Sequence, residues 1–283
     1  MLLALLLAVT QGRVYAARFE VRGAQVAVWR YVAAAPRNGP PVVIFGELGF
    51  DNSTVAPLAA ALQARGRDVF TPDWRGTGQS TAGPDFEGLE AVWLGDAQAA
   101  LDTALRETGA PCAQLVGLGV GGAAVWLLAG KACALVAINV PVRWEVPNEA
   151  VRKLLTIPLA SVQGLFAQPF GARDAGELLL GLPLRDRRGV GRVTPALARD
   201  VLGLMQGGPL ATRIAAAAEE SRVPLLVVTA PRDNLVHPEH ALALKRPHDT
   251  VVLSRIEGYP QEHAHLPVPH ALFAEVATWL ASH

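Results

Sequence analysis

Short, mostly apolar runs separated by helical patterns are the feature that most constrains the fold of this chain of 283 residues. Apolar runs of about four to eight residues between turn signals are typical of buried strands. Strands are expected at Arg18–Arg22, Gln25–Tyr31, Val42–Phe45, Asp68–Thr71, Ala113–Gly117, Ala134–Ile138, Pro224–Thr229 and Thr250–Leu253. Helical patterns at 55–64, 89–108, 121–128 and 271–282 alternate with them. This alternation predicts βαβ units and a mainly parallel sheet with right-handed crossovers.

One long stretch, from about 141 to 220, interrupts the alternation. It carries no strand signal, and prolines divide its helical pattern, at Pro147, Pro158, Pro169, Pro183 and Pro195. We expect a single domain at 17–283, with its core in 17–140 and 221–283. A helical cap of about 141–220 would follow the sixth strand and cover the carboxyl ends of the strands, where open α/β sheets bind ligands.

Composition excludes several classes of partner. Lys and Arg number 25, as do Asp and Glu, so the formal net charge is zero. A neutral chain lacks the electrostatic attraction that nucleic acids or anionic membrane surfaces require. Hydrophobic residues make up 51% of the chain, enough to bury a large core. The histidines and acids have no metal-ligand spacing, so neither a metal nor another cofactor is expected.

The N-terminal segment has two interpretations. Met1–Val9 is wholly apolar, but it is shorter than the roughly 20 residues that a transmembrane helix needs. It fits a signal-peptide core, and Val14-Tyr15-Ala16 is similar to a cleavage site, so residues 1–16 are a candidate signal peptide. No basic residue precedes the apolar run, which fits a buried N-terminal segment of a cytoplasmic protein equally well.

The two cysteines bear on the same question. Cys112 and Cys133 lie at the starts of two expected strands. If these strands are parallel neighbours, both thiols lie at one end of the sheet, within reach of disulfide geometry. An exported protein would form this disulfide, whereas a cytoplasmic one would carry two buried thiols.

A glycine-dense turn at 117–122 joins an expected strand to an apolar helix. This is the context of the nucleophile elbow, in which G-x-S-x-G places a serine on a strained turn between strand and helix. Gly117 and Gly121 occupy the two glycine positions of that motif. Gly119 stands where the serine should be.

The same turn also matches the dinucleotide-binding pattern G-x-G-x-x-G through Gly117, Gly119 and Gly122. That pattern belongs in the first βαβ unit, with an acidic residue about 20 positions further on. Here it follows the fifth strand, and the residues at that distance are Asn139 and Val140. We therefore do not expect dinucleotide binding.

Three other segments resemble proteins of the α/β-hydrolase fold. Pro72–Ser80, with the sequence PDWRGTGQS, resembles their P-D-x-R-G-x-G-x-S turn. Val223–Val228, followed by Arg232 and Asp233, resembles the strand and turn that carry the acid of the catalytic triad, and Glu262–Leu266 resembles the loop that carries the histidine. The order elbow, acid, histidine is also that of the family. The resemblance implies a capped α/β-hydrolase fold of the esterase and lipase kind.

The resemblance also implies roles for individual residues. Asp233 would orient His263, which would act as the general base. His265, two residues further on, is an alternative base. The backbone N–H groups of Leu48 and Val120 would form the oxyanion hole.

The chain departs from the family at the nucleophile. Gly119 has no side chain, so the elbow cannot form an acyl-enzyme. Glu47 brings a carboxylate near a site that normally stabilises negative charge. No convincing replacement is found among Glu47, Asp51, Ser80, Cys112 and Ser161, since carboxylate nucleophiles of this fold sit at the elbow itself.

We therefore expect a non-hydrolytic member of the fold that binds a small apolar or ester-like molecule, or a protein partner, under the cap. Asp233 and His263 would then be a remnant. One alternative is an esterase or lyase-type enzyme that uses this dyad as a general base without a covalent step. Another is an ordinary serine esterase in which Gly119 is a sequence variant.

Overall fold

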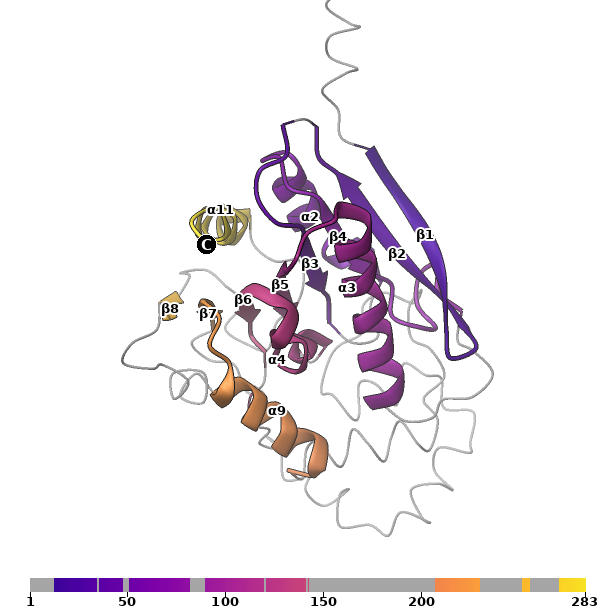
Figure 1. Cartoon of the computed structure of the whole chain (residues 1–283), viewed down its shortest axis with the longest axis vertical. Coiled ribbons are helices and arrows are strands. Elements are labelled where there is room, and N and C mark those ends of the chain that lie inside the picture. The colour runs from indigo at the N-terminus through magenta and orange to yellow at the C-terminus, as the bar shows by residue number, and fades with distance from the viewer. Residues whose placement is uncertain are drawn as a thin grey trace, which may run out of the picture.

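A mixed sheet forms the centre of the molecule (Figure 1). The computed structural model describes residues 13–34, 36–47, 51–81, 90–119, 121–140, 142, 207–229, 251–254 and 270–283. Within them, eight strands lie in the order β1-β2-β4-β3-β5-β6-β7-β8. Their bounds are β1 Arg13–Val21, β2 Ala24–Val32, β3 Val42–Phe45, β4 Val69–Pro72, β5 Ala113–Leu118, β6 Ala132–Ile138, β7 Leu225–Val228 and β8 Val251–Ser254. β2 is antiparallel to β1 and β4, and the other pairs are parallel, which confirms the predicted sheet.

Helices cover both faces of the sheet (Figure 1). The α-helices are α2 Ala56–Gln63, α3 Gly95–Thr108, α4 Ala124–Leu127, α9 Pro209–Glu220 and α11 His270–Ala281. Shorter turns are η1 Asn52–Thr54, η2 Glu90–Leu94, η3 Gly121–Ala123 and η4 Ala129–Lys131. Side chains of α3, α4 and α9 share one core cluster with the sheet, and those of α2 and α11 share the other.

Strand β3 shows why these apolar runs become central strands. All four of its residues are buried. Val43 and Phe45 belong to the core cluster on one face, and Val42 and Ile44 belong to the cluster on the other. Successive side chains of a strand point to opposite faces, so a run that is apolar at every position requires helices on both sides.

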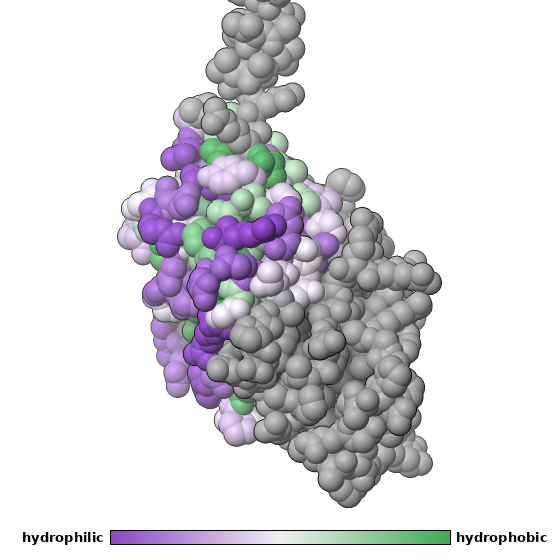
Figure 2. All heavy atoms as spheres, turned by 90° about the vertical axis from the view of Figure 1, so that its right-hand side faces the viewer, coloured by the Kyte–Doolittle hydropathy of each residue, from purple (hydrophilic) through white to green (hydrophobic). Residues whose placement is uncertain are grey.

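The N-terminal hairpin is longer than the sequence predicted. β1 begins at Arg13 rather than at Arg18, because it pairs with β2 along its whole length, from Arg13 opposite Val32 to the turn. Positive φ angles at Arg22 and Gly23 close that turn. The candidate cleavage site Val14-Tyr15-Ala16 lies inside β1. Figure 2 shows this side of the molecule, where the described surface is mainly hydrophilic with scattered hydrophobic residues.

The predicted cap lies largely outside the described residues, which resume at Gly207. The last part of that stretch forms α9, which packs against α4. Its Ala211, Ile214 and Ala218 are buried in the core cluster. Helix α9 is thus part of the layer that covers the sheet. No helix in the described ranges has the length and apolarity to cross a bilayer.

Candidate functional site

The turn after β5 has the geometry of a sharp strand-to-helix bend. β5 is buried throughout and ends at Leu118. Gly119 follows with φ of +56°, and its N–H donates a hydrogen bond to Ile138 O at 3.0 Å. A Cβ on Gly117 would lie 2.8 Å from Gly122 Cα, closer than real Cβ atoms come. Glycine is therefore required at 117 and 122 so that the strand and the following turn can touch.

Glu47 occupies the space beside Gly119. It follows β3, which is the parallel neighbour of β5, with Phe45 opposite Gly117. Glu47 is only 2% exposed. A Cβ built on Gly119 would overlap Glu47 Oε2 and would lie 2.6 Å from the carboxyl carbon. Any side chain at position 119 therefore competes with this carboxylate for the same volume.

Backbone groups of the turn also face Glu47. The Gly121 N–H donates to Glu47 Oε1 over a long distance of 3.4 Å. Gly121 is the first residue of η3. Backbone N–H groups that stabilise negative charge in hydrolases come from this kind of turn. In this chain a neighbouring N–H of the same turn, that of Gly121, faces the Glu47 carboxyl group.

Two buried tryptophans fix the two glycine-bearing turns. Trp74 donates from Nε1 to Gly46 O at 3.1 Å, and its ring lies 6.3 Å from that of Phe45. Trp93 donates from Nε1 to Gly121 O at 3.0 Å. Both tryptophans are buried, as is common for core residues, but the hydrogen bonds of their indoles to these turns carry no sequence signal.

The segment with the sequence PDWRGTGQS is a structural turn. Asp73 accepts hydrogen bonds from the Asn52 N–H at 2.7 Å, from Trp29 Nε1 at 2.9 Å and from the Gln79 N–H at 2.8 Å. The Ser80 hydroxyl donates to Asp73 O at 2.7 Å and accepts from the Ala27 N–H at 2.8 Å. Ser80 is therefore engaged in the turn, in agreement with its rejection as a nucleophile.

An ion pair beneath this turn anchors it to α3. Arg75 Nη2 lies 2.7 Å from Asp96 Oδ1, and both side chains are about 1% exposed. The Arg75 N–H also donates to Asp96 Oδ2 at 3.0 Å. Burial raises the pKa of the Asp96 carboxyl, and the hydrogen bonds and charge of Arg75 oppose that shift.

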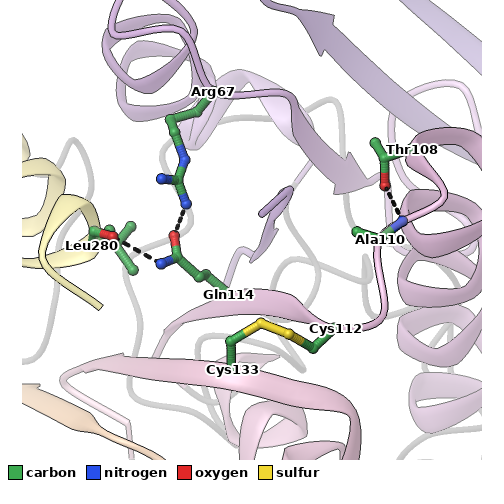
Figure 3. Close-up of a disulfide and its surroundings, with 7 residues drawn as sticks. All are labelled: Arg67, Thr108, Ala110, Cys112, Gln114, Cys133 and Leu280. Carbon is green, nitrogen blue, oxygen red and sulfur yellow. Dashed lines mark hydrogen bonds between the residues drawn. A yellow bond between two sulfur atoms is a disulfide. The ribbon is translucent and has the colours of Figure 1, made fainter. Parts of the chain in front are cut away.

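The cysteines lie at the other end of β5, away from Gly119. Cys112 and Cys133 form a disulfide with their Cα atoms 5.5 Å apart (Figure 3). Cys112 is therefore no thiol nucleophile. Nearby, Gln114 accepts a hydrogen bond from Arg67 Nη2 and donates from Nε2 to Leu280 O at 2.8 Å. These contacts connect the start of β5 to α11.

The remaining predicted site residues fall outside the described residues: Leu48, Val120, Asp233, His263, His265 and Ser161. Asp51 is described, and it caps η1 by accepting from the Ser53 N–H at 2.9 Å. Among the described residues, no cluster of three His, Cys, Asp or Glu side chains is arranged to hold a metal ion.

Comparison with known proteins decides the family. A sequence model described as the alpha/beta hydrolase family matches residues 38–277. This chain belongs to the alpha/beta hydrolase family. The match extends across the elbow turn, the PDWRGTGQS turn and the segments that carry Asp233 and His263. No curated protein matched the chain.

Solved structures of alpha/beta hydrolases have the same fold. A haloalkane dehalogenase from Bradyrhizobium elkani matches with a TM-score of 0.61 at 18% identity, over 95% of this chain and 98% of its own. A monoacylglycerol lipase from Paleococcus ferrophilus matches with a TM-score of 0.58 at 19% identity, over 95% and 99%. An esterase from Thermogutta terrifontis matches with a TM-score of 0.61 at 19% identity, over 94% and 98%. At these identities the likeness establishes the fold alone.

Proposed function

We propose that this alpha/beta hydrolase family member forms no acyl-enzyme at its elbow and instead binds a small apolar molecule or a protein partner under the predicted cap. The observation that carries the proposal is the Glu47 carboxylate in the volume where a side chain at position 119 would begin. A covalent mechanism needs a nucleophilic atom at this turn, and glycine supplies none. The lack of a side chain at Gly119 leaves room for the Glu47 carboxylate, and that carboxylate occupies the space that a side chain at position 119 would need.

Charge supports the same conclusion. Acyl transfer passes through an intermediate with a negatively charged oxygen, which backbone N–H groups of the elbow stabilise. In this chain the Gly121 N–H faces Glu47 Oε1 at 3.4 Å. The oxyanion itself would lie at the adjacent Val120 N–H, so it would form close to the Glu47 carboxyl group, and like charges a few ångströms apart repel strongly in a buried site. Ester hydrolysis by the usual route is disfavoured twice, by the lack of a nucleophile and by this repulsion.

The test restores the nucleophile in steps and measures hydrolysis of short-chain nitrophenyl esters. The wild type should be inert. Gly119→Ser alone should stay well below the double variant in activity, because the Glu47 carboxyl group must move aside to make room for the new Cβ. The double variant Glu47→Ala, Gly119→Ser should gain esterase activity that His263→Ala abolishes. Wild-type turnover that is lost in His263→Ala would contradict the proposal.

A matched control separates space from charge. Glu47→Gln keeps the size of the side chain and removes its charge. Glu47→Gln, Gly119→Ser should stay inert if the overlap decides, because the amide fills the same volume as the carboxylate. If this variant gains as much activity as the Glu47→Ala double variant, the carboxylate blocks the site through its charge rather than its volume.

A second candidate follows from the same observation. Sequence reasoning rejected Glu47 as a nucleophile because carboxylate nucleophiles of this fold sit at the elbow itself, yet the Glu47 carboxylate lies beside the elbow turn. In this alternative Glu47 attacks an electrophilic carbon, the leaving group departs with the bonding electrons, and an ester forms on Glu47. A water molecule deprotonated by His263, which Asp233 orients, then hydrolyses that ester.

Mass spectrometry distinguishes the two candidates. If Glu47 is the nucleophile, Glu47→Gln abolishes turnover, and His263→Ala accumulates a covalent adduct on the peptide that contains Glu47. The non-hydrolytic proposal predicts no adduct with alkyl halides, epoxides or esters. It further predicts that ligand binding survives His263→Ala.

A further inference from the structure

A pocket lies at the end of the sheet opposite Gly119. It has a volume of about 290 Å³ and opens between the ends of α2 and α11 and the loop before β4. Leu62, Ala277, Leu280 and Ala281 form its apolar walls. Asn38, Arg65 and Arg67 supply its polar groups. The described lining thus contains two cationic side chains and no acidic one.

Arg67 is the unusual member of this lining. It is only 5% exposed, and its Nε is buried without a hydrogen-bond partner among the described residues. Its Nη2 donates to Gln114 Oε1 (Figure 3). Burial lowers the pKa of its guanidinium, a cost that a buried cation without an opposite charge incurs. Buried charges in proteins are normally paired, so an anion bound beside the Arg67 guanidinium would supply the opposite charge.

No acid within the described part of the chain forms an ion pair with Arg67. The adjacent carboxylate, Asp68, instead faces Arg37 Nε at 3.0 Å and Arg30 Nη2 at 3.8 Å. Asp68 also accepts a hydrogen bond from the Ala33 N–H at 2.9 Å. Asp68 therefore interacts with Arg37 and Arg30 rather than with Arg67.

Helix dipoles compensate the two arginines only in part. The pocket lies at the carboxyl ends of α2 and α11, and each helix end carries about half a negative charge. Arg65 Nη1 lies 3.4 Å from Ala61 O in the last turns of α2. The two half charges of the helix ends offset at most half of the two full positive charges of the arginines.

The backbone is shaped around the guanidinium. Gly39 has φ of +82°, and a Cβ there would lie 3.0 Å from Arg67 Cζ. A glycine at this position permits both the left-handed turn and the close approach. A side chain at position 39 would therefore displace the Arg67 guanidinium from its place beside this turn.

We infer that this pocket binds the carboxylate of a small apolar acid, with Arg65 and Arg67 on the carboxylate and the Leu and Ala side chains around the hydrocarbon. Guanidinium groups match carboxylates in shape and charge. The apolar walls favour an acid with an aliphatic tail over a plain inorganic anion. This site is independent of the chemistry proposed at Gly119 and Glu47.

Calorimetric titration with hexanoate, hexanol and inorganic phosphate tests the site. Hexanoate should bind, and hexanol and phosphate should bind at least about tenfold more weakly. Phosphate that binds as tightly as hexanoate would overturn the choice of an apolar acid. Hexanol that binds as tightly as hexanoate would show that the arginines do not contact the ligand.

Variants locate the site. Arg67→Met should weaken hexanoate about tenfold or more, since a charged hydrogen bond is lost. Arg65→Gln, at an exposed position that leaves folding intact, should weaken it about two- to fivefold. Glu47→Gln, at the other end of the sheet, should leave it unchanged. Binding that ignores both arginine variants, or that changes mainly in Glu47→Gln, would place the ligand elsewhere and overturn the inference.

Discussion

Removal of the Cys112–Cys133 disulfide should lower the free energy of unfolding by about 3 kcal/mol. The bond joins residues 21 apart in sequence. A cross-link that closes a loop of this length removes about 11 cal/mol/K of conformational entropy from the unfolded chain, equivalent to about 3 kcal/mol at 25 °C. The closed loop contains β5, the turn at Gly119, α4 and the start of β6. The elbow turn of the candidate site therefore lies within the cross-linked segment, whereas Glu47 lies outside it.

Thermal and urea unfolding of Cys112→Ser, Cys133→Ser measure this loss. A change of 1 kcal/mol shifts the melting temperature of domains of about 150–250 residues by about 2 to 4 °C, so a decrease of about 6 to 12 °C is expected. Each single variant should match the double variant, because either one breaks the bond. A reducing agent should lower the stability of the wild type to that of the variants and should leave the double variant unchanged.

Two results would refute this reasoning. One is equal stability of the wild type and the double variant when mass spectrometry shows the bond formed in the wild type. The other is a reductant effect of equal size on the double variant, which would place the sensitivity outside these cysteines.

Three sets of substitutions test individual contacts, and N-terminal sequencing tests the candidate leader. Asp96→Ala should lower the free energy of unfolding in urea by about 3 to 5 kcal/mol, because it leaves Arg75 buried without its partner. The control Asp102→Ala removes an exposed ion pair with Lys131 and should lower it by less than about 1 kcal/mol. Burial raises the pKa of Tyr31 above its ordinary value, so the phenol loses its proton at a higher pH in the folded state than in the unfolded state. The free energy of unfolding should therefore fall as pH rises above about 10. Tyr31→Phe should lose this contribution to the pH dependence, as measured by unfolding at several pH values. Gly117→Ala should cost about 1 to 3 kcal/mol by forcing β5 away from Gly122, whereas Gly130→Ala, where a Cβ meets nothing within 4 Å, should be nearly neutral. If residues 1–16 are a cleaved leader, N-terminal sequencing of the exported protein should begin at Ala17, with Arg13–Ala16 of β1 removed; a mature chain that retains Arg13 would contradict that cleavage site.

The sequence by itself determined most of the architecture. Runs that are apolar at every position, such as Val42–Phe45, can be buried only between two layers of helices, and the structure places them there. The glycines at 117 and 122 predicted a close turn after β5, and the motif around Asp73 predicted the turn after β4. Such features are local, because backbone sterics and side-chain periodicity operate over a few residues.

The order of the strands was decided only by the tertiary structure. β3 lies between β4 and β5, so the end of β3 comes beside the end of β5 although α2, β4 and α3 intervene in the chain. That placement brings Glu47 against Gly119 and Gly121, although Gly121 is 74 positions further along the chain than Glu47. Sequence reasoning placed Glu47 near the site but rejected it as a nucleophile, because carboxylate nucleophiles of this fold sit at the elbow itself. Spacing along the chain could not show that Glu47 contacts the elbow turn.

The same holds for the pocket at Arg67. Gln114 connects Arg67 to Leu280, which is 166 residues away from Gln114. No pattern in the sequence marks Arg67 as buried, since an arginine that follows a helix usually lies in water. The packing of α11 against the sheet encloses it. Contacts between elements that are distant in the chain decide which charged side chains are buried and which groups they contact. These contacts form only when the sheet assembles.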